Sequence, residues 1–387
     1  MGAVTATFTS SVLPPHERGV ELGRHFAPEI ARTVATYRTL FETVAQGRPF
    51  DVDLWSDRAW RTISRVAPQH ADEIAGIAEG AGLTVQELAS VNARTELLVA
   101  ANPTGQTECS TVVSLPPGRP PVAVQTWDWY DAMSEGWFTW TIPMPDGRVV
   151  ETVTEYGMLA KIGVNDRGVG VMLNMLHHHN DTETGDEVGH PVHLLARAIL
   201  DDASSAKEAV DLASAPWTSA STSLTVVDDR GGAASVELFP GGPGVLEPTD
   251  GVLVRTNHFV SEAGRDGCLA SSISVSTELR RRHLVETLDG TVPQTAADVV
   301  EAMTHHLADG GVCRHPITST DPVLWHRTLA TVAIDVAGRS LDVRENGPCG
   351  HRMLPVEQPA SGAVRPPWRG LRPLPPRATS PGRTPTR

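Results

Sequence analysis

Cys109 is the side chain whose type and position best suit nucleophilic chemistry. It stands in TECSTVVSL, after the loop-like stretch NPTGQTE and directly before an apolar strand. A structural cysteine would more naturally occupy an alternating core position inside that strand, although a small apolar residue at a strand start is the alternative interpretation. A thiol at this junction could attack a carbonyl carbon, so Cys109 is our candidate nucleophile.

A nucleophilic thiol needs a base, which is usually a histidine. The chain has 15 histidines, and the sequence alone does not choose among them. An N-terminal cysteine would instead use its own α-amino group, whose reference pKa of about 7.7–8.0 suits a base near neutral pH. The chain would then have to cut itself between Glu108 and Cys109, by thiol attack on the preceding carbonyl, an N-to-S shift and hydrolysis of the thioester.

Other histidines and cysteines raise the question of a metal site. The residues concerned are His177-His178-His179 with His190 and His193, and Cys313-Arg314-His315 with Cys349-Gly350-His351. Zinc sites usually show local chelating pairs such as CxxC or HxxxH, which these segments lack. Three adjacent histidines on a strand would also point to alternate faces, and the polar residues that follow favour a loop. We therefore predict no metal and no resident cofactor.

The elements that must position Cys109 come in blocks. Apolar residues at helical spacing predict helices over residues 17–46, split at Pro28, and over 68–82 and 84–100, the last opened by a capping box at Thr84 and Glu87. Short β-rich stretches separated by Gly and Pro turns predict an antiparallel meander from 110 to 176. A helix in two pieces over 191–213, strands over 223–259, helices over 277–308 and strands over 328–344 complete the order.

Blocks of strands and helices favour two antiparallel sheets with helices outside over a doubly wound βαβ fold. The predicted fold class is therefore α+β, a four-layer αββα sandwich with a helical N-terminal segment. We expect a helical part at 1–108 and a catalytic αββα domain at 109–354. The residues 355–387, rich in Pro and Arg, are expected to be a disordered tail.

Several motifs resemble, in order, those of one protein family. ECSTVVSLPPGRPPVAVQTWDW, with Trp127-Asp128-Trp129 across a predicted hairpin from Cys109, resembles the acyl-CoA:6-aminopenicillanic-acid acyltransferase (isopenicillin-N acyltransferase) family of N-terminal-nucleophile hydrolases. The resemblance continues through VNARTEL, GVNDRGVGVMLN, RTNHF, GGVCRHP and RTLATVAIDVAGRSLDV, and covers roughly residues 15–350. It implies an autoproteolytic acyltransferase or amidohydrolase that works through a thioester on Cys109.

The resemblance also implies roles for individual residues. Asp128 would hold the freed amine or position the substrate, and Asn257 would donate its side-chain amide to the oxyanion. Arg327 would organise the site electrostatically. Weaker supporting candidates are Thr111, Ser221 and Ser223. A turn-forming Asp128, a strand-end Asn257 and a solvated Arg327 remain the alternatives. Glu108 departs from the small residue that would leave more room at the cleavage turn.

The amino-acid composition limits the classes of binding partner that we expect for this chain. The 46 acidic and 32 basic side chains give a net charge of −14, which argues against nucleic-acid binding. The sequence shows neither a membrane-spanning stretch nor a signal peptide, so we expect a cytoplasmic protein with reduced thiols. Its expected partners are a small-molecule acyl amide or acyl-CoA, with acyl-CoA as a co-substrate, and its own segments 1–108 and 109–387 after cleavage.

Two alternative functions remain open. One is a conventional cysteine hydrolase with a histidine base, for which His258 is the candidate because it follows Asn257 directly. The other is a non-catalytic binding protein of the same fold, in which Cys109 never becomes N-terminal.

Overall fold

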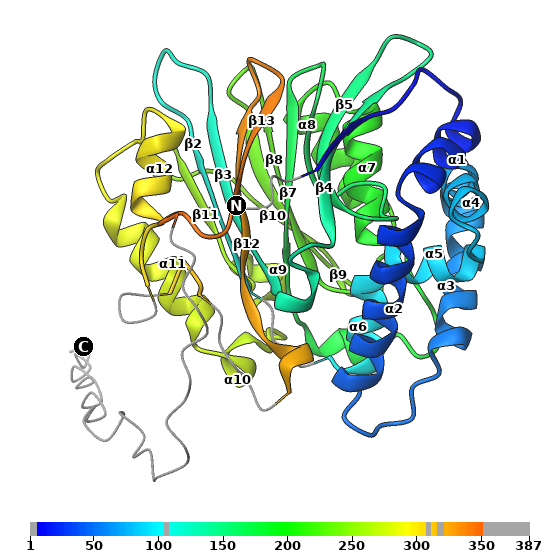
Figure 1. Ribbon diagram of the computed structural model, residues 1–387. Helices are drawn as coiled ribbons and strands as arrows, with labels where there is room; N and C mark the ends of the chain where they lie inside the picture. Colours follow the sequence, from blue (N-terminus) through cyan, green and yellow to red (C-terminus); the bar gives the residue numbers. More distant parts are fainter. Residues whose placement is uncertain (1–5, 104–107, 307–310, 316–320, 351–387) are drawn as a thin grey trace, which may run out of the picture. The chain divides into compact units, whose positions relative to one another are not determined.

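Two β-sheets form the centre of the protein (Figure 1). The computed structural model describes residues 6–103, 108–306, 311–315 and 321–350. One sheet has 8 strands in the order β1-β4-β5-β6-β7-β8-β9-β10, and the other has 5 in the order β11-β2-β3-β12-β13. The strand pairs are antiparallel except for β1 with β4. Consecutive strands from β4 to β10 pair as neighbours. The predicted meander is therefore correct from β4 to β7, but β2 and β3, which it also included, form a hairpin in the smaller sheet.

The strands occupy the segments rich in β-branched and aromatic residues. Those of the larger sheet are β1 (Thr7–Thr9), β4 (Trp137–Pro143), β5 (Val149–Glu155), β6 (Ile162–Asn165), β7 (Val169–Met175), β8 (Thr222–Asp228), β9 (Ala233–Phe239) and β10 (Gly242–Leu246). Those of the smaller sheet are β2 (Glu108–Ser114), β3 (Val122–Tyr130), β11 (Val252–Arg255), β12 (His326–Asp335) and β13 (Ser340–Glu345).

Helices cover the outer faces of both sheets (Figure 1). On the larger sheet, α7 (Val192–Asp202) contacts β6 and β7, and α8 (Ala206–Ser214) contacts β8 and β9. On the smaller sheet, α11 (Ser276–Thr287) contacts β2 and β11, and α12 (Ala296–Ala302) contacts β3. The sheets face each other through β2 with β7 and β12 with β6. The resulting helix–sheet–sheet–helix order confirms the predicted αββα sandwich.

In the described part of the chain, six helices precede β2, the strand that carries Cys109. They are α1 (Pro15–His25), α2 (Ala27–Val44), α3 (Val52–Val66), α4 (Pro68–Ala81), α5 (Val85–Asn92) and α6 (Arg94–Ala101). The predicted break at Pro28 lies in the first turn of α2, and the predicted capping box of Thr84 and Glu87 opens α5. Helices α1 and α4 cross in close contact because both carry glycines there: a Cβ on Gly19 would lie 2.2 Å from the Glu73 carbonyl oxygen.

Three elements differ from the sequence prediction. The segment that was expected to be wholly helical opens with β1, a three-residue strand that pairs with β4 at the edge of the larger sheet. Helix α3 was missed, although the Asp51 side chain caps it by accepting from the backbone amides of Asp53 and Leu54. Strand β10, which contains two glycines and a proline, pairs with β9 in a hairpin. Strands β1 and β10 were too short to show a clear period, whereas the buried residues of α3 do recur at helical spacing and could have been recognised.

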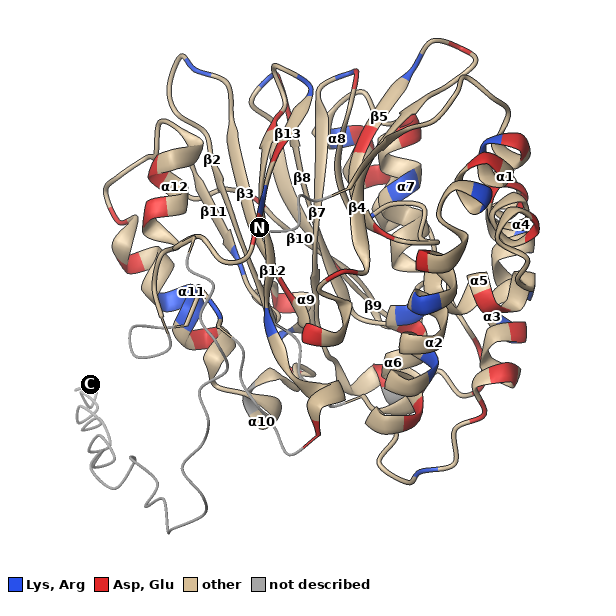
Figure 2. Ribbon diagram, in the orientation of Figure 1, with Lys and Arg blue, Asp and Glu red and all other residues tan. Residues whose placement is uncertain are grey.

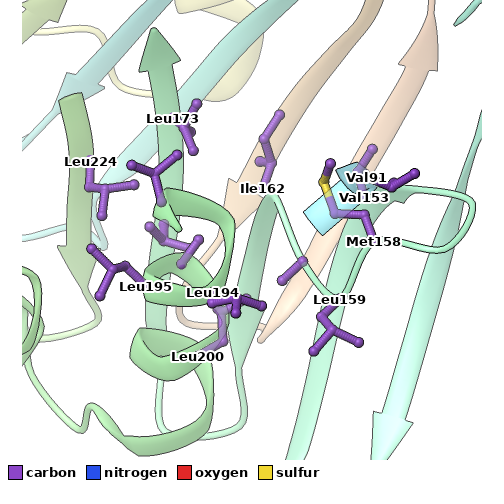
Figure 3. Packing of buried hydrophobic residues seen from close by; sticks show 14 of the residues in the cluster. Val91, Val153, Met158, Leu159, Ile162, Leu173, Leu194, Leu195, Leu200 and Leu224 are labelled. Atoms are coloured by element: carbon purple, nitrogen blue, oxygen red, sulfur yellow. The ribbon is translucent and has the colours of Figure 1, made fainter. Parts of the chain in front are cut away.

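The main core fills the space between the two sheets and the space between the larger sheet and the helices around it. Figure 3 shows leucines of α7, Leu194, Leu195 and Leu200, beside Leu173 of β7 and Leu224 of β8. Burying a side chain of this size stabilises the fold by about 1.5–3 kcal/mol. Such packing fixes the sheet whose inner face supports the candidate site.

Short helical turns complete the described chain. They are η1 (Asp131–Met133), η2 (His179–Thr182), α9 (Glu262–Arg265), α10 (Ala270–Ile273) and η4 (Pro322–Leu324). All of these elements belong to one compact unit, Met1–Pro355. The tail expected at 355–387 lies outside the described residues. Among the described helices, none combines the length and apolar character that a bilayer crossing requires.

Candidate active site

Cys109 is the second residue of β2 and pairs directly with Trp127 of β3. Its position agrees with the predicted loop–strand junction. The side chain points into the space between the sheets, where it is 7% exposed and belongs to the main core. Its Sγ atom lies 3.7 Å from the Asp128 carbonyl oxygen. The thiol is therefore held at the start of the strand, with little access to solvent.

The electrostatic surroundings of Cys109 favour the neutral thiol in the uncleaved chain. Burial, with a smaller contribution from the Asp128 carboxylate, raises the pKa of the Cys109 thiol to about 11. The positive charges of Lys161 and Arg280 oppose that rise. A thiol with this pKa is protonated near neutral pH, so nucleophilic attack requires a group that removes its proton.

Asn257 contacts the backbone of Cys109 directly. It follows β11, and its Oδ1 accepts a hydrogen bond from the Cys109 amide N–H at 2.7 Å. Its Nδ2 donates to the Met175 carbonyl at 2.9 Å, and its own backbone N–H donates to Thr277 Oγ1 at 2.7 Å. These three bonds fix the orientation of the amide. Because an NH₂ group carries two protons and Met175 accepts one, the second is available in principle to a developing oxyanion.

Arg280 is the main site residue that the sequence interpretation missed. It projects from α11 and is fully buried. One of its terminal nitrogens donates to the Cys109 carbonyl and to Ser110 Oγ, both at 2.8 Å, and the other donates to Asn257 Oδ1 at 3.0 Å. Burial lowers the pKa of Arg280 from its ordinary value, while the Asp128 carboxylate opposes that effect. The forked guanidinium thus ties Cys109 to Asn257.

Little in the sequence singled out Arg280. It belongs to a run of three arginines, Arg280 to Arg282, which typically indicates a solvated helix face. Figure 2 shows this basic cluster on α11. Only the packing of α11 against β2 and β11 turns one of the three towards Cys109.

Asp128 lies on the other face of the five-stranded sheet from the Cys109 side chain. Since Cys109 pairs with Trp127, and neighbouring residues of a strand alternate between faces, the Asp128 side chain points towards the helices. Its Oδ1 accepts from Thr328 Oγ1 at 2.6 Å, and its buried Oδ2 accepts no hydrogen bond within the described part of the chain. Burial raises the pKa of Asp128 to about 7, although the Arg280 charge opposes it. A shift of this size marks a candidate functional group.

A buried charged cluster lies on the thiol side of the sheet. Lys161 Nζ lies 3.4 Å from the centre of the Trp127 ring and 4.0 Å from Glu155 Oε2. Glu155 also accepts from Tyr37 at 2.6 Å and from Arg94 at 2.9 Å. Burial holds the pKa of Lys161 well below its ordinary value, although Glu155 opposes that effect. Lys161 precedes β6 and is the second residue near the thiol that the sequence interpretation missed.

Two of the remaining candidates lie close to Cys109 along the chain or in space. Thr111 points between the sheets, where its hydroxyl donates to Asn174 Oδ1 at 2.8 Å and accepts from Gln125 at 2.9 Å. His258 follows Asn257, and its Nδ1 lies 3.0 Å from Thr277 Oγ1. Burial and three nearby arginines lower the pKa of His258 to about 3. The ring is therefore neutral, and its Nδ1 is engaged with a threonine hydroxyl.

Arg327, Ser221 and Ser223 make their hydrogen bonds or ion pairs elsewhere. Arg327 forms an ion pair with Asp131 and donates to Asn346 Oδ1 at 2.7 Å. Ser221 donates to Asp181 Oδ1 at 2.7 Å, and Ser223 shares a 2.6 Å hydrogen bond with Ser235. The structure thus brings together Cys109, Asn257 and Arg280. The Asp128 side chain lies on the helix side of the sheet, as Arg280 does, whereas Arg327, Ser221 and Ser223 are engaged with other partners.

A large surface hollow does not lead to this cluster. It has a volume of about 1220 Å³ and is lined by residues of α3, α7 and α8, including Arg58, and by Trp217 beyond α8, but not by Cys109. Its lining contains no thiol, and its size is therefore a poor guide to the chemistry. The buried nucleophile with its perturbed neighbours is the better candidate.

The chain resembles a curated protein in sequence and several solved structures in fold. The chain is 28% identical over 340 residues to the acyl-coenzyme A:6-aminopenicillanic-acid-acyltransferase 40 kDa form of Emericella nidulans. The alignment covers 86% of this chain and 91% of that protein. Among solved structures, penicillin V acylase from Agrobacterium tumefaciens matches with a TM-score of 0.42 and 12% identity over 61% of this chain and 83% of that one.

A second structural match is a variant of the conjugated bile acid hydrolase of Clostridium perfringens, with a TM-score of 0.36 and 13% identity over 61% of this chain and 92% of that one. The family model for acyl-coenzyme A:6-aminopenicillanic acid acyl-transferase matches residues 116–349, a range that contains Asp128, Asn257 and Arg280 and begins just after Cys109. This match confirms the resemblance drawn from the ordered motifs. The chain belongs to the acyl-coenzyme A:6-aminopenicillanic acid acyl-transferase family.

Proposed function

We propose that this chain is an autoproteolytic cysteine N-terminal-nucleophile enzyme that transfers or hydrolyses an acyl group through a thioester on Cys109. The observation that carries the proposal is that both backbone groups of Cys109 are hydrogen-bonded: Asn257 accepts from its N–H at 2.7 Å, and Arg280 donates to its carbonyl at 2.8 Å. These two hydrogen bonds hold the thiol in a fixed place relative to the peptide bond before it. Fixed geometry of this kind is what an intramolecular attack needs.

Self-cleavage would proceed in two balanced steps. The Cys109 Sγ attacks the Glu108 carbonyl carbon, the C–N bond breaks, and the nitrogen of Cys109 takes up the thiol proton as it becomes an amine. Water then hydrolyses the Glu108 thioester, which leaves a carboxylate on Glu108 and restores the thiol. The oxyanion of each step would be stabilised by the second proton of Asn257 Nδ2.

Cleavage would supply the missing base. The freed α-amino group, with a reference pKa of about 7.7–8.0, belongs to the same residue as the thiol and can remove its proton near neutral pH. Asn257 Oδ1, which accepts from the amide of Cys109 in the uncleaved chain, would accept from the new amine and orient its lone pair. This explains why a thiol whose pKa is raised to about 11 can still act as a nucleophile.

Turnover would use the same groups. The thiol attacks an acyl carbonyl, the acyl–nitrogen or acyl–CoA bond breaks, and the leaving group takes the proton held by the α-amine. Water or an acceptor amine then attacks the thioester, and the thiol is released. The name of the relative from Emericella nidulans supports acyl-CoA as a co-substrate. Arg280 would hold Asn257 and Cys109 in register, and Asp128 would balance the Arg280 charge.

The two pieces would stay together after cleavage. Buried polar contacts join the first piece to the second: Arg94 and Tyr37 bind Glu155, at 2.9 and 2.6 Å. Asn92 donates to the Gly157 carbonyl at 2.8 Å, and β1 pairs with β4. Together with the apolar packing of six helices, these contacts support an enzyme of two tightly associated segments, 1–108 and 109–387.

The proposal is tested by coupling processing to activity. Intact-mass analysis is compared for the wild-type chain, Cys109→Ala and the control Cys268→Ala, and each protein is assayed against penicillins, N-acyl amino acids and acyl-CoAs. We expect cleavage and turnover in the wild type and the control, and neither in Cys109→Ala. Turnover by an uncleaved wild-type chain would overturn the N-terminal-nucleophile mechanism, and turnover lost on His258→Gln with cleavage intact would favour a histidine base.

A further inference from the structure

Four side chains gather at a place remote from Cys109 in the sequence. They are His306, Cys313, His315 and Cys349, and one potential ligand atom of each lies within 4.8 Å of all the others. The Cys349 sulfur lies 3.6 Å from His315 Nε2, and the Cys313 sulfur lies 4.0 Å from the same nitrogen. The rings of His306 and His315 stack at 4.9 Å between centroids. The cluster brings together two thiols and two imidazoles.

The separations are close to those of a tetrahedral zinc site. Zinc binds cysteine sulfur at about 2.3 Å and histidine nitrogen at about 2.0–2.1 Å, so tetrahedral ligand atoms stand roughly 3.3–3.8 Å apart. The measured 3.6 Å falls in that range, and the 4.0 Å contact needs only a slight contraction. Two cysteines with two histidines also form a ligand set that selects zinc.

Independent features point to a bound ion at this place. His306 Nε2 is buried and makes no hydrogen bond within the described part of the chain, a condition that costs free energy unless a ligand satisfies it. The Cys313 side chain is 1% exposed. The backbone at Gly347 passes so close that a Cβ there would lie 2.5 Å from the Cys313 sulfur. The backbone at Gly347 thus closes one side of the Cys313 thiol.

From this geometry we infer that His306, Cys313, His315 and Cys349 bind one zinc ion in a closed, structural site. Each cysteine would lose its thiol proton on binding, so two protons are released for each ion, and the two thiolates neutralise its charge. Four protein ligands leave no position for a substrate or an activated water. The ion would fasten the chain after α12 to the chain after β13.

The fastened segment leads directly to the active site. The backbone of Arg314, between two of the ligands, donates to Thr328 Oγ1 at 3.0 Å and accepts from the Thr328 N–H at 3.1 Å. The Thr328 hydroxyl in turn donates to Asp128 Oδ1 at 2.6 Å. The zinc site would therefore help to hold Asp128 in place without touching any reacting atom.

The expectation of no metal rested on local spacing. Cys313 and His315 have one residue between them, but His306 precedes this pair in the chain and Cys349 follows it. Helix α12 ends at Ala302, earlier than predicted, so His306 lies beyond the helix. A site assembled from separate segments has no local motif to display.

Metal analysis tests the inference. The full-length protein, freed of any affinity tag, is stripped with chelator, incubated with excess Zn²⁺, dialysed and analysed for zinc. We expect about one zinc per chain in the wild type and in the control Cys268→Ser, and less than about 0.1 in Cys313→Ser and Cys349→Ser. Cobalt in place of zinc should give the intense visible bands of a tetrahedral thiolate site in the first two proteins and not in the last two.

Three results would overturn the inference. They are a wild type that retains no zinc, equal retention by Cys313→Ser and the wild type, and a Cys313–Cys349 disulfide that persists in reduced protein, detected as the loss of two hydrogens by mass. Repeating the measurement in Cys109→Ala separates this inference from the proposed function. That chain cannot cleave itself, but it should still bind zinc.

Discussion

Asn257 is proposed to act in two ways, and two substitutions separate them. Its Oδ1 accepts from the Cys109 N–H, and its Nδ2 would donate to the oxyanion. Asn257→Asp keeps the acceptor and removes the donor, whereas Asn257→Ala removes both. Loss of one oxyanion donor costs about 2.7–4 kcal/mol of transition-state stabilisation, or roughly 10²–10³ in rate. We therefore expect self-cleavage of Asn257→Asp to slow by that factor, and of Asn257→Ala by at least as much.

The hydrogen bonds of Asn257 also determine how much each substitution lowers the free energy of unfolding. Asn257→Ala removes two neutral hydrogen bonds, with Cys109 and Met175, and one from the Arg280 guanidinium. At about 0.5–1.5 kcal/mol for a neutral bond and 1.5–3 kcal/mol for a charged one, the free energy of unfolding should fall by roughly 2.5–6 kcal/mol. Asn257→Asp loses the Met175 bond alone, so it is the better-folded variant for kinetics.

Pulse-labelled cell-free synthesis with a denaturing quench follows the fraction cleaved from the moment the chain is made. His258→Gln, which changes the next residue and keeps a hydrogen-bonding side chain, is the matched control and should cleave within a few-fold of the wild type. Cleavage of Asn257→Asp at the wild-type rate would refute the oxyanion role of the amide.

Three further predictions concern Arg280, Asp128 and the proposed zinc. Arg280→Lys keeps the charge but loses the forked guanidinium that bonds Cys109, Ser110 and Asn257. Self-cleavage should therefore slow by about tenfold, the effect of losing one hydrogen bond of about 1.4 kcal/mol. The control Arg281→Lys, at a half-buried neighbour, should cleave at the wild-type rate, and equal cleavage rates of the two variants would contradict the role of Arg280. The pKa of Asp128 is raised from 3.8 to about 7 by burial, so between these values the native state binds more protons than the unfolded state and loses stability as pH rises. From pH 4 to pH 8, the free energy of unfolding of Asp128→Asn, measured by denaturant titration, should therefore rise by up to about 4 kcal/mol relative to that of the wild type. Glu96 and Asp181, whose pKa values are also raised, titrate alike in both proteins. Parallel curves of unfolding free energy against pH would therefore contradict the assignment to Asp128. Chelation should lower the melting temperature of the wild type and Cys268→Ser but not that of Cys313→Ser, and a uniform response would argue against a structural ion.

Much of the fold followed from local sequence pattern. The Gly and Pro turns between β4 and β7 and the capping box at Thr84 mark element ends through backbone conformation that any fold must respect. Strand β1 was missed because its stability comes from a tertiary partner, β4. Helix α3 has a capping residue and helical spacing of its buried residues, so it could have been recognised from the sequence. Propensity is a weak guide where tertiary contacts decide.

From the residues alone, only the part of the site on neighbouring strands was predictable, whereas Asn257 came from the family resemblance. Cys109 and Asp128 could be placed because β2 and β3 pair across one hairpin. That the Asp128 side chain faces away from the thiol follows from register, which sequence leaves undetermined until both strand starts are known. Arg280 reaches the Cys109 carbonyl from a helix 171 residues later in the chain. Lys161 approaches from the facing sheet, so neither residue has a local motif.

The central claim is that the chain becomes active by cutting itself before Cys109. The most direct measurement is the intact mass and N-terminal sequence of the purified wild-type protein, made together with an assay of its acyl-transfer or hydrolytic turnover. The self-cleavage mechanism predicts two co-eluting pieces, 1–108 and 109–387, the second beginning with Cys109, and turnover that appears only with that new terminus. A single uncleaved chain that turns over substrate at the full rate would contradict it.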